Sequence, residues 1–278
     1  MEVVAPGDAA SQRTPRGRLT LRVARVAAIV IGACLAIDGF AIEPFAIEVT
    51  RHRVTANVTS PLRIAHLTDL HTDGPGRRER EVLEILDREK PDVIAVTGDT
   101  VDGGSLEVAR PFFARLRAPL GIWVVRGNWE NWRSPGDEAG FYRSTGATFL
   151  LNEGRLARPD VFIGGLDDSM SGHSNMAQAF RDAPAGVFRL ALFHSPEAFD
   201  GAAGRFDLAL AGHTHGGQVR VPWLGAPWLP PGSGRYVQGW YTGTNTRMYV
   251  SRGVGTSILP VRLFCRPEVA IVTIVPTE

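Results

Sequence analysis

The chain has 278 residues, of which 44% are hydrophobic, and a chain of this kind can bury one large core. Its formal net charge is +1, so the chain as a whole has no electrostatic preference for nucleic acid, and we expect no nucleic-acid partner. Its two cysteines, Cys34 and Cys265, lie far apart in the sequence, which argues against a disulfide framework.

The N-terminal part divides into a basic segment and a hydrophobic one. Residues 1–20 are polar and contain Pro, Gly and Arg, a composition that predicts disorder. Residues 21–41 contain the apolar run Val26–Ile37 behind this basic flank, an order typical of a membrane anchor or a signal-like segment. The run is short, so a helix packed on the domain is the alternative. Residues 42–278 form the predicted main domain.

From Leu62 onward, strand patterns alternate with helix patterns. Helical spacing of apolar residues predicts a helix over Arg78–Lys90, and a second helix is expected over Leu106–Leu116. Five short apolar runs are typical of buried strands: Leu62–Leu67, Val93–Val96, Ile122–Val125, Phe188–Phe193 and Phe206–Ala211. This alternation is typical of βαβ units with parallel pairing, so we expect an α/β fold.

Each of these strands is followed by residue types that bind metals. The residues are Asp69, His71, Asp99, Asn128, His194, His213 and His215. Because the carboxyl ends of parallel strands meet at one edge of a sheet, these side chains are expected to gather there. Asp69 and His71 are two residues apart, which on an extended chain places both side chains on one face. Glycines around His213 and His215 would let the chain turn with a positive φ.

Each of these residues also has an ordinary explanation. An aspartate at a strand end commonly caps a turn, and a pair of histidines in a loop is often just polar surface. The joint occurrence of two aspartates, one asparagine and four histidines at strand ends nevertheless predicts a site for divalent metals. Mixed oxygen and nitrogen ligands suit Mn, Fe or Zn.

Five motifs, in chain order, resemble those of the calcineurin-like metallophosphoesterases: Asp69-x-His71, Gly98-Asp99, Gly127-Asn128, His194 and Gly212-His213-x-His215. The resemblance extends from about Ile42 to Ile274. The tail, with Ser251–Ser257 and Arg266–Glu268, is similar to a membrane-associated bacterial phosphodiesterase branch of that family.

The resemblance implies a four-layer αββα sandwich with two metal ions at one end. It assigns one ion to Asp69, His71 and His215 and the other to Asn128, His194 and His213, with Asp99 bridging them. Asp99, Asn128 and His213 are the expected catalytic residues. Two metals about 3.5–4 Å apart can activate a water and clamp phosphoryl oxygens, so the expected activity is that of a binuclear phosphoesterase.

The third motif departs from the family pattern at Trp129, where family members usually have a histidine that assists the leaving group. Indole cannot act as a general acid near neutral pH. The chain is therefore either an impaired, non-catalytic metal-binding relative or an enzyme whose leaving group needs no proton. The second interpretation favours a P–O–P bond, because phosphate is a much less basic leaving group than an alkoxide.

Family members that cleave UDP-2,3-diacylglucosamine resemble this chain in lacking that histidine. The favoured prediction is therefore pyrophosphatase-like hydrolysis of a phosphorylated, lipid-linked substrate, with a general phosphodiesterase of the cell envelope as the alternative. No residue is assigned to substrate binding, although four arginines near the site in sequence could contact a phosphate: Arg220, Arg235, Arg252 and Arg262.

The loop Val221–Pro231 contains two tryptophans and two leucines among prolines and glycines. It is expected either to form a wall beside the site or to contact acyl chains or a bilayer. Together with the N-terminal segment, it predicts association with the bacterial inner membrane. The basic flank favours a cytoplasmic N-terminus, so a spanning segment would place the domain outside the cytoplasm. A nucleotide-linked lipid instead requires the domain on the cytoplasmic face, so the membrane side stays open.

Overall fold

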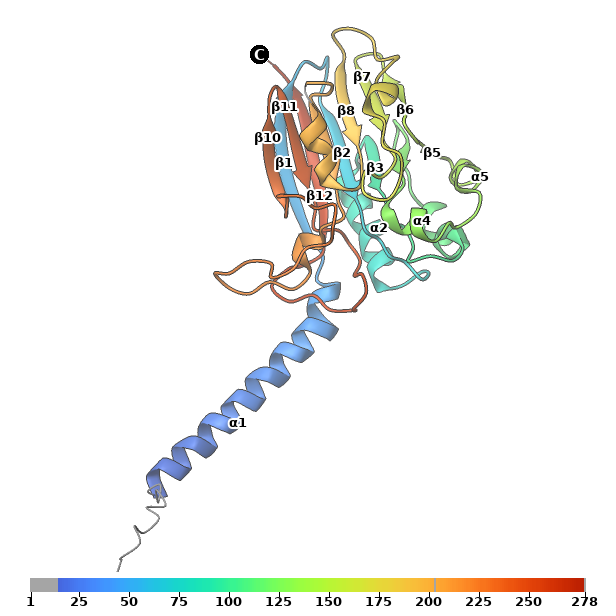
Figure 1. Ribbon diagram of the computed structural model, residues 1–278. Coiled ribbons are helices and arrows are strands. Elements are labelled where there is room, and N and C mark those ends of the chain that lie inside the picture. The colour runs from blue at the N-terminus through green and yellow to red at the C-terminus, as the bar shows by residue number, and fades with distance from the viewer. Residues whose placement is uncertain (1–14, 203, 278) are drawn as a thin grey trace, which may run out of the picture.

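The computed structural model describes the backbone of residues 15–202 and 204–277. Two six-stranded sheets pack face to face, and helices cover their outer sides, so the predicted αββα sandwich is confirmed (Figure 1). The first sheet has the order β1 (Glu48–Ala56), β12 (Glu268–Pro276), β2 (Leu62–Leu67), β3 (Val93–Thr97), β4 (Ile122–Val125) and β5 (Ala147–Phe149). The second has the order β10 (Gly239–Gly243), β11 (Thr246–Val250), β9 (Leu208–Ala211), β8 (Phe188–Leu192), β7 (Val161–Gly165) and β6 (Glu153–Arg158).

Parallel pairing runs through the centre of both sheets, as the alternating pattern predicts. Strands β2, β3, β4 and β5 are parallel neighbours, and so are β7, β8, β9 and β11. Antiparallel pairs join β12 to β2, β10 to β11 and β6 to β7. The carboxyl ends of β2, β3, β4, β8 and β9 therefore supply the loops that carry the predicted metal ligands.

Three apolar clusters separate the four layers. One lies between α2 (Arg77–Glu89) and the first sheet and contains Val82, Ile85 and Leu86. The second fills the space between the sheets, where Ile64 from β2 and Leu190 from β8 are fully buried. The third covers the outer side of the second sheet. The buried faces of the strands thus hold the two sheets in register around the metal-ligand loops.

Apart from α2 and the N-terminal helix, the helices are short. The helix expected over Leu106–Leu116 is a 3-10 turn, η3 (Leu106–Ala109), followed by α3 (Arg110–Phe113). Pro111 lies in the first turn of α3, where its missing N–H needs no acceptor, so it starts a new helix instead of continuing one. The others are η1 (Asp38–Ile42), η2 (Glu43–Phe45), α4 (Asn128–Trp132), α5 (Glu138–Ser144), α6 (Met176–Ala179), η4 (Pro196–Gly201) and η5 (His215–Gly217).

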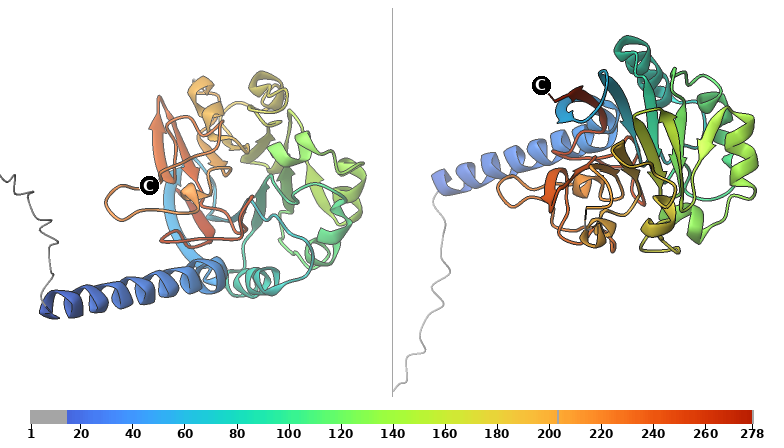
Figure 2. Two further views of the ribbon diagram at one scale, coloured as in Figure 1. Left: turned by 60° about the horizontal axis from the view of Figure 1, so that its bottom comes forward. Right: turned by 90° about the horizontal axis from the view of Figure 1, so that it is seen from above.

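An N-terminal helix, α1 (Pro15–Ile37), stands away from the domain in every view (Figures 1 and 2). It begins at Pro15, so the end of the segment predicted as disordered is helical; residues 1–14 lie outside the described part. Within Arg22–Phe45, a window of 18 residues has a mean hydropathy of 2.0, and only 11% of its residues are buried, so the stretch is long and apolar enough to cross a membrane. The alternative of a helix packed on the domain is therefore wrong.

Candidate metal centre

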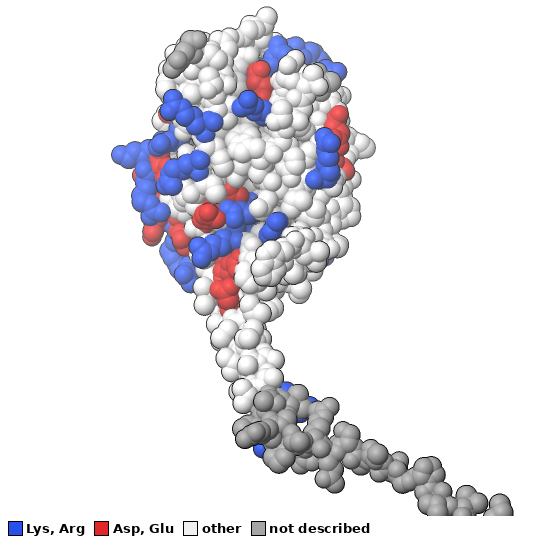
Figure 3. Space-filling model, turned by 90° about the vertical axis from the view of Figure 1, so that its left-hand side faces the viewer, with Lys and Arg blue, Asp and Glu red and all other residues white. Residues whose placement is uncertain are grey.

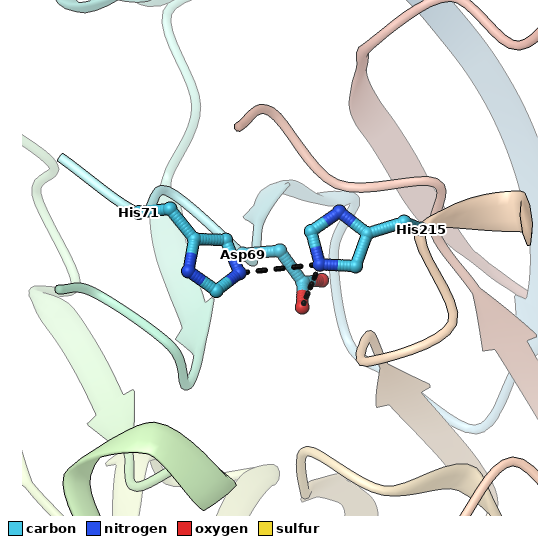
Figure 4. Close-up of side chains that lie close together, drawn as sticks. All are labelled: Asp69, His71 and His215. Atoms are coloured by element: carbon cyan, nitrogen blue, oxygen red, sulfur yellow. Dashed lines mark hydrogen bonds and ion pairs between the residues drawn. The ribbon is translucent and has the colours of Figure 1, made fainter. Parts of the chain in front are cut away.

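The predicted ligands meet in two buried groups at the carboxyl ends of the strands. Asp69, His71 and His215 offer ligand atoms that all lie within 4.8 Å of one another. His71 Nε2 lies 3.1 Å from His215 Nε2, which in turn lies 3.4 Å from Asp69 Oδ1. Figure 4 shows both imidazoles turned towards the Asp69 carboxylate. One carboxylate and two imidazole nitrogens thus converge on one small volume.

The second group contains Asp99, His194 and His213, whose ligand atoms also lie within 4.8 Å of one another. His194 Nε2 lies 3.2 Å from Asp99 Oδ2 and 3.1 Å from His213 Nδ1. Asn128 joins this group, because its Oδ1 lies 2.9 Å from His194 Nε2 and 2.8 Å from His213 Nδ1. The amide oxygen therefore points at the same place as the two imidazole nitrogens.

Asp99 lies between the two groups. Its Oδ2 is 3.2 Å from His194 Nε2 in one group and 3.7 Å from His71 Nε2 in the other. The structure thus brings all seven residues together in the two sets that the resemblance implies; their roles as ligands stay predictions. A carboxylate in this position offsets the repulsion between two cations held by the two groups.

Five of the seven ligand residues have a left-handed backbone: φ is 51° at Asp69, 43° at His71, 51° at Asp99, 71° at His213 and 49° at His215. The expectation of an extended chain at Asp69 and His71 is therefore wrong, although the two side chains do share one group. Left-handed backbone at non-glycine residues is costly and clusters at functional sites. Hydrogen bonds from Asp69 N to Gly98 O (3.1 Å) and from His71 N to Asp99 O (3.0 Å) hold the turn.

Close packing of the loops requires glycine beside the ligands. Gly98 has φ +83°, and a Cβ there would lie 2.6 Å from the Gly127 backbone and 2.8 Å from His194 Nδ1. Gly253, with φ +70°, would place a Cβ 2.7 Å from the Cβ of Asp69. These approaches let loops of both sheets and of the C-terminal tail surround one site.

Three histidines are oriented by an acceptor on the nitrogen that faces away from the centre. His194 Nδ1 donates to Thr97 O (2.8 Å), His213 Nε2 donates to Pro231 O (2.5 Å), and His71 Nδ1 donates to the Asp102 carboxylate. Each bond fixes the tautomer and leaves the other nitrogen lone pair directed inward, as a metal requires. Asp102 is a functional residue that the sequence did not identify, although it lies in the polar stretch after β3.

His215 differs, because its Nδ1 lies 3.5 Å from the guanidinium of the fully buried Arg262. Burial and the positive charges of His71 and Arg262 lower the pKa of His215 well below its usual value. His215 is therefore neutral at pH 7 and can offer Nε2 as a ligand.

Glu130 is a second functional residue that the sequence did not identify. Its carboxylate accepts backbone N–H bonds from Thr100 (2.6 Å), Gly127 (2.9 Å) and Asp99 (3.0 Å). Burial and the charge of Asp99 raise its pKa to about 7. Its role is to hold the ends of β3 and β4 together, and its position three residues after Gly127 is the spacing of a helix-capping glutamate.

Glu130→Gln is expected to lower metal affinity about 10–100-fold, the usual effect of losing a partner that positions a ligand. The amide NH2 would face backbone donors and displace Asp99 from its place between the groups. Metal titration followed by elemental analysis measures this change. Glu84→Gln, an exposed change on α2, is the matched control and should change nothing. Equal affinity in the two variants would contradict a positioning role for Glu130.

Two of the predicted ligands, His194 and His71, have a raised pKa. Burial acts against the charged forms of both histidines, but Asp99 and Asp69 raise the pKa of His194, and Asp102 and Asp99 raise that of His71. A dication must displace protons held by raised-pKa histidines, so we expect its affinity to increase as the pH rises through neutrality. Calorimetry in buffers of different ionisation enthalpy counts the protons released. Binding without proton release, and with the same affinity at each pH, would contradict this.

Trp129 lines the rim of the site. Its backbone N donates to Asp99 Oδ1 (2.9 Å), and its indole Nε1 donates to Ser257 Oγ (3.2 Å). The ring lies edge-on to His71, with ring centroids 6.2 Å apart. The side chain is thus fixed as a wall and offers no acidic proton to a substrate.

The four arginines considered for phosphate binding are engaged elsewhere. Arg262 donates to backbone carbonyls, Arg252 pairs with Glu268 and Glu48, and Arg220 donates to Gly216 O. Arg235 is mostly exposed and lies near Asp200. Of the four, Arg262 alone contacts a predicted ligand, which makes it a support for His215.

Comparison with known proteins matches residues 62–217, more than half of the chain, to the family model described as calcineurin-like phosphoesterase. The chain is 32% identical over 252 residues to phosphodiesterase YaeI of Escherichia coli, covering 84% of this chain and 90% of the relative. It is 29% identical over 275 residues to the uncharacterized metallophosphoesterase YkuE of Bacillus subtilis, covering 90% and 95%.

A third relative is a bovine protein named as a transmembrane protein with a metallophosphoesterase domain, 29% identical over 285 residues, or 91% of this chain and 62% of that one. The matched region contains every predicted ligand, and the family is metal-dependent. The chain therefore belongs to the calcineurin-like phosphoesterase family and is a hydrolase of phosphoester bonds.

Proposed function

We propose that the chain is a binuclear phosphodiesterase or pyrophosphatase that acts at a bacterial membrane on a bond with a weakly basic leaving group. The observation that carries this proposal is the pair of buried ligand groups that share Asp99, with Trp129 at their rim. A relative is named a phosphodiesterase, which supports the same reaction class.

The donor set fits two divalent ions of the Mn, Fe or Zn type, because each group combines imidazole nitrogens with a carboxylate oxygen and one adds an amide oxygen. Two such ions would polarise the phosphoryl group and lower the pKa of a water molecule. The chain itself supplies two carboxylates that balance the charge of the ions. It also fixes the tautomers of His71, His194 and His213, and it buries the ligands so that bulk water does not compete for them.

The side chains beside the metal centre indicate which leaving groups the site can release. The Trp129 indole donates to Ser257, and the Glu130 carboxylate is turned towards backbone N–H groups. Neither side chain delivers a proton to a departing oxygen. A phosphate or an aryl oxide leaves readily without that help, whereas an alkoxide leaves more slowly. A P–O–P bond, as in a nucleotide-diphosphate lipid, or an activated diester is therefore the proposed substrate class.

The alternative raised by the sequence, a metal-binding relative without catalysis, rests on Trp129 standing where family members usually have a histidine. An activity screen of the metal-loaded protein separates the two. It covers aryl diesters, alkyl monoesters, nucleotide-diphosphate lipids and cyclic nucleotides. Turnover of diesters or anhydrides supports an enzyme, whereas binding of phosphorylated ligands without any turnover supports the non-catalytic relative.

Membrane attachment is proposed to reside in α1. Removal of residues 1–37 leaves intact the contacts of Gly39 and Glu43 with the domain. We expect the full chain to need detergent for extraction from membranes and the shortened chain to be extracted without it, with unchanged metal content. Fractionation and elemental analysis test this. A full chain that is soluble without detergent would contradict it.

The membrane side decides between the two substrate classes. A reporter fused to the C-terminus reads the side of the domain. A domain outside the cytoplasm, which the basic flank favours, supports an envelope phosphodiester. A domain inside supports a nucleotide-linked lipid.

A further inference from the structure

Large exposed apolar side chains gather in two loops of the catalytic domain. In the loop after η5, Trp223 is fully exposed, and Leu224 and Trp228 are 75% and 60% exposed. In the loop before β12, Ile258 and Leu259 are 77% and 59% exposed. We call the surface formed by residues 221–228 and 257–264 the foot face. The expectation that the first loop packs as a wall on its own domain is therefore wrong at its tip.

The two loops form one unit. Gln218 connects them, because its side-chain Nε2 donates to the carbonyls of Ser257 (3.2 Å) and Leu259 (2.9 Å). Leu263 N donates to Gln218 O (3.0 Å), and Arg220 N donates to Leu263 O (2.8 Å). The apolar side chains are therefore presented by a hydrogen-bonded platform.

The foot face is continuous with the end of α1. Arg262 N donates to Gly39 O (2.9 Å), and Phe264 N donates to the Glu43 carboxylate (2.8 Å). A Cβ on Gly39 would lie 3.3 Å from the Val261 side chain, so the chain leaving α1 packs directly on the second loop. Any bilayer that α1 crosses therefore meets the domain at this face.

The figures show how the first loop is directed. In Figures 1 and 2 the orange loop after η5 projects from the domain towards the side on which α1 lies. Figure 3 shows uncharged atoms projecting beside the neck where α1 joins the domain. The surface that would face the membrane thus presents no charged side chain at the projecting loop.

The tip of this loop is an ordered turn. Val221 N donates to Gly225 O (2.8 Å), and Leu224 N donates to Val221 O (3.1 Å). Trp223 has a φ of 66°, a left-handed conformation that is costly for a bulky residue. The strained backbone thus holds the indole in solvent, where it makes no packing contact that would offset the strain. Backbone strain of this kind clusters at ligand clamps and other functional sites.

We propose that the foot face docks on the lipid bilayer and inserts Trp223, Leu224 and Trp228 at the level of the headgroups. Tryptophan is enriched at that level, because its ring is apolar and its N–H is polar. A second copy of the chain is the other occupant that apolar loops would suit. The bilayer fits better, because the anchor leaves the domain from the same face and α1 is exposed along its apolar length.

Docking also fixes where the metal centre lies. Ser257 in the foot face accepts the indole N–H of Trp129 at the rim, and Gln218 follows η5, which carries His215. The rim of the metal centre therefore adjoins the membrane contact. This part rests on the proposed function, and it favours a substrate whose phosphate lies among the lipid headgroups.

The test uses the full chain in vesicles of phosphatidylcholine and phosphatidylglycerol. Cys34→Ser removes the exposed thiol, whereas Cys265 is buried and stays. Leu224→Cys in the foot face and Leu156→Cys on β6 then carry an environment-sensitive fluorophore, and both leucines are exposed. Lipids with a quencher on the upper acyl chain are expected to remove most emission at position 224 and none at 156. Aqueous iodide is expected to do the reverse.

Iodide quenching at 224 equal to that at 156, without quenching by lipid, would overturn the proposal. A fluorophore at position 224 that is protected from iodide but not quenched by lipid, and that loses this protection when the protein is diluted in lipid, would overturn the proposal in favour of a second copy. The triple variant Trp223→Ser/Leu224→Ser/Trp228→Ser adds a separate readout. It should hydrolyse a soluble aryl diester at the unchanged rate and show a higher KM for a nucleotide-diphosphate lipid carried in the vesicles. No turnover of either substrate by the unmodified chain would instead refute the proposed function and leave the fluorescence result intact.

Discussion

Asp99→Ala is expected to remove both metal ions and to abolish hydrolysis. The Asp99 carboxylate lies 3.2 Å from His194 Nε2 and 3.7 Å from His71 Nε2, so its loss takes a ligand from both groups at once. Burial opposes its charged form, but His194 and His71 lower the pKa of Asp99 to about 2, so it is fully ionised at neutral pH. The expected loss of metal affinity exceeds about 100-fold, the upper end for losing only an outer partner.

Metal content after gel filtration, measured together with diester hydrolysis, checks this prediction. Asp87→Ala, at an exposed position of α2, is the matched control and should retain both metals. Asp99→Asn separates charge from shape, because the amide can still accept the Trp129 N–H bond. One firmly bound metal per chain in Asp99→Ala would mean that Asp99 serves a single ion and does not bridge.

Hydrolysis is expected to depend steeply on the pKa of the leaving group. General acid assistance is typically worth about 10²–10⁴-fold, and its value grows with the basicity of the leaving group. Because the Trp129 indole provides none, aryl and phosphate leaving groups should depart faster than alkyl ones by a factor in this range. Rates for a series of aryl and alkyl diesters, plotted against leaving-group pKa, measure the slope.

Trp129→His should flatten the slope where the imidazole reaches the departing oxygen, and Trp129→Phe is the matched control that keeps an aromatic wall. Both variants lose the hydrogen bond from the indole to Ser257, so a change in rate that both show is attributed to the loss of that bond. A flat plot for the unmodified chain, with the chemical step limiting, would mean that another group supplies the proton. The preference for a P–O–P substrate would then lose its basis.

The gathering of the seven ligand residues was predictable because local signals encode it. Apolar runs such as Val93–Val96 identify buried strands, and parallel pairing brings their carboxyl ends together whatever the details of the turns. Positive φ at His213 and His215 was not predictable, since propensity assigns such turns to glycine, and here tertiary hydrogen bonds impose them on histidine.

The residues that contact the predicted ligands from distant positions in the chain were also not predictable from the sequence. The bond from His71 to Asp102 crosses 31 positions, and the approach of Arg262 to His215 crosses 47. Neither pair has a periodicity or spacing that marks it. The start of α1 at Pro15 was missed for a different reason, since the polar composition around it predicts disorder and gives no apolar face to detect.

The position of β12 has a consequence for biosynthesis. This strand pairs with β1 on one side and β2 on the other, so β1 has no neighbour in the first sheet until residues 268–276 have been synthesised. Glu268 N at its start also donates to Gly253 O (2.8 Å), next to Asp69. A chain synthesised only as far as Cys265 therefore lacks both the strand that joins β1 to β2 and the bond that holds the loop beside Asp69. Metal binding is therefore expected only after residues 268–276 have joined the first sheet, and a chain truncated before Glu268 should bind no metal.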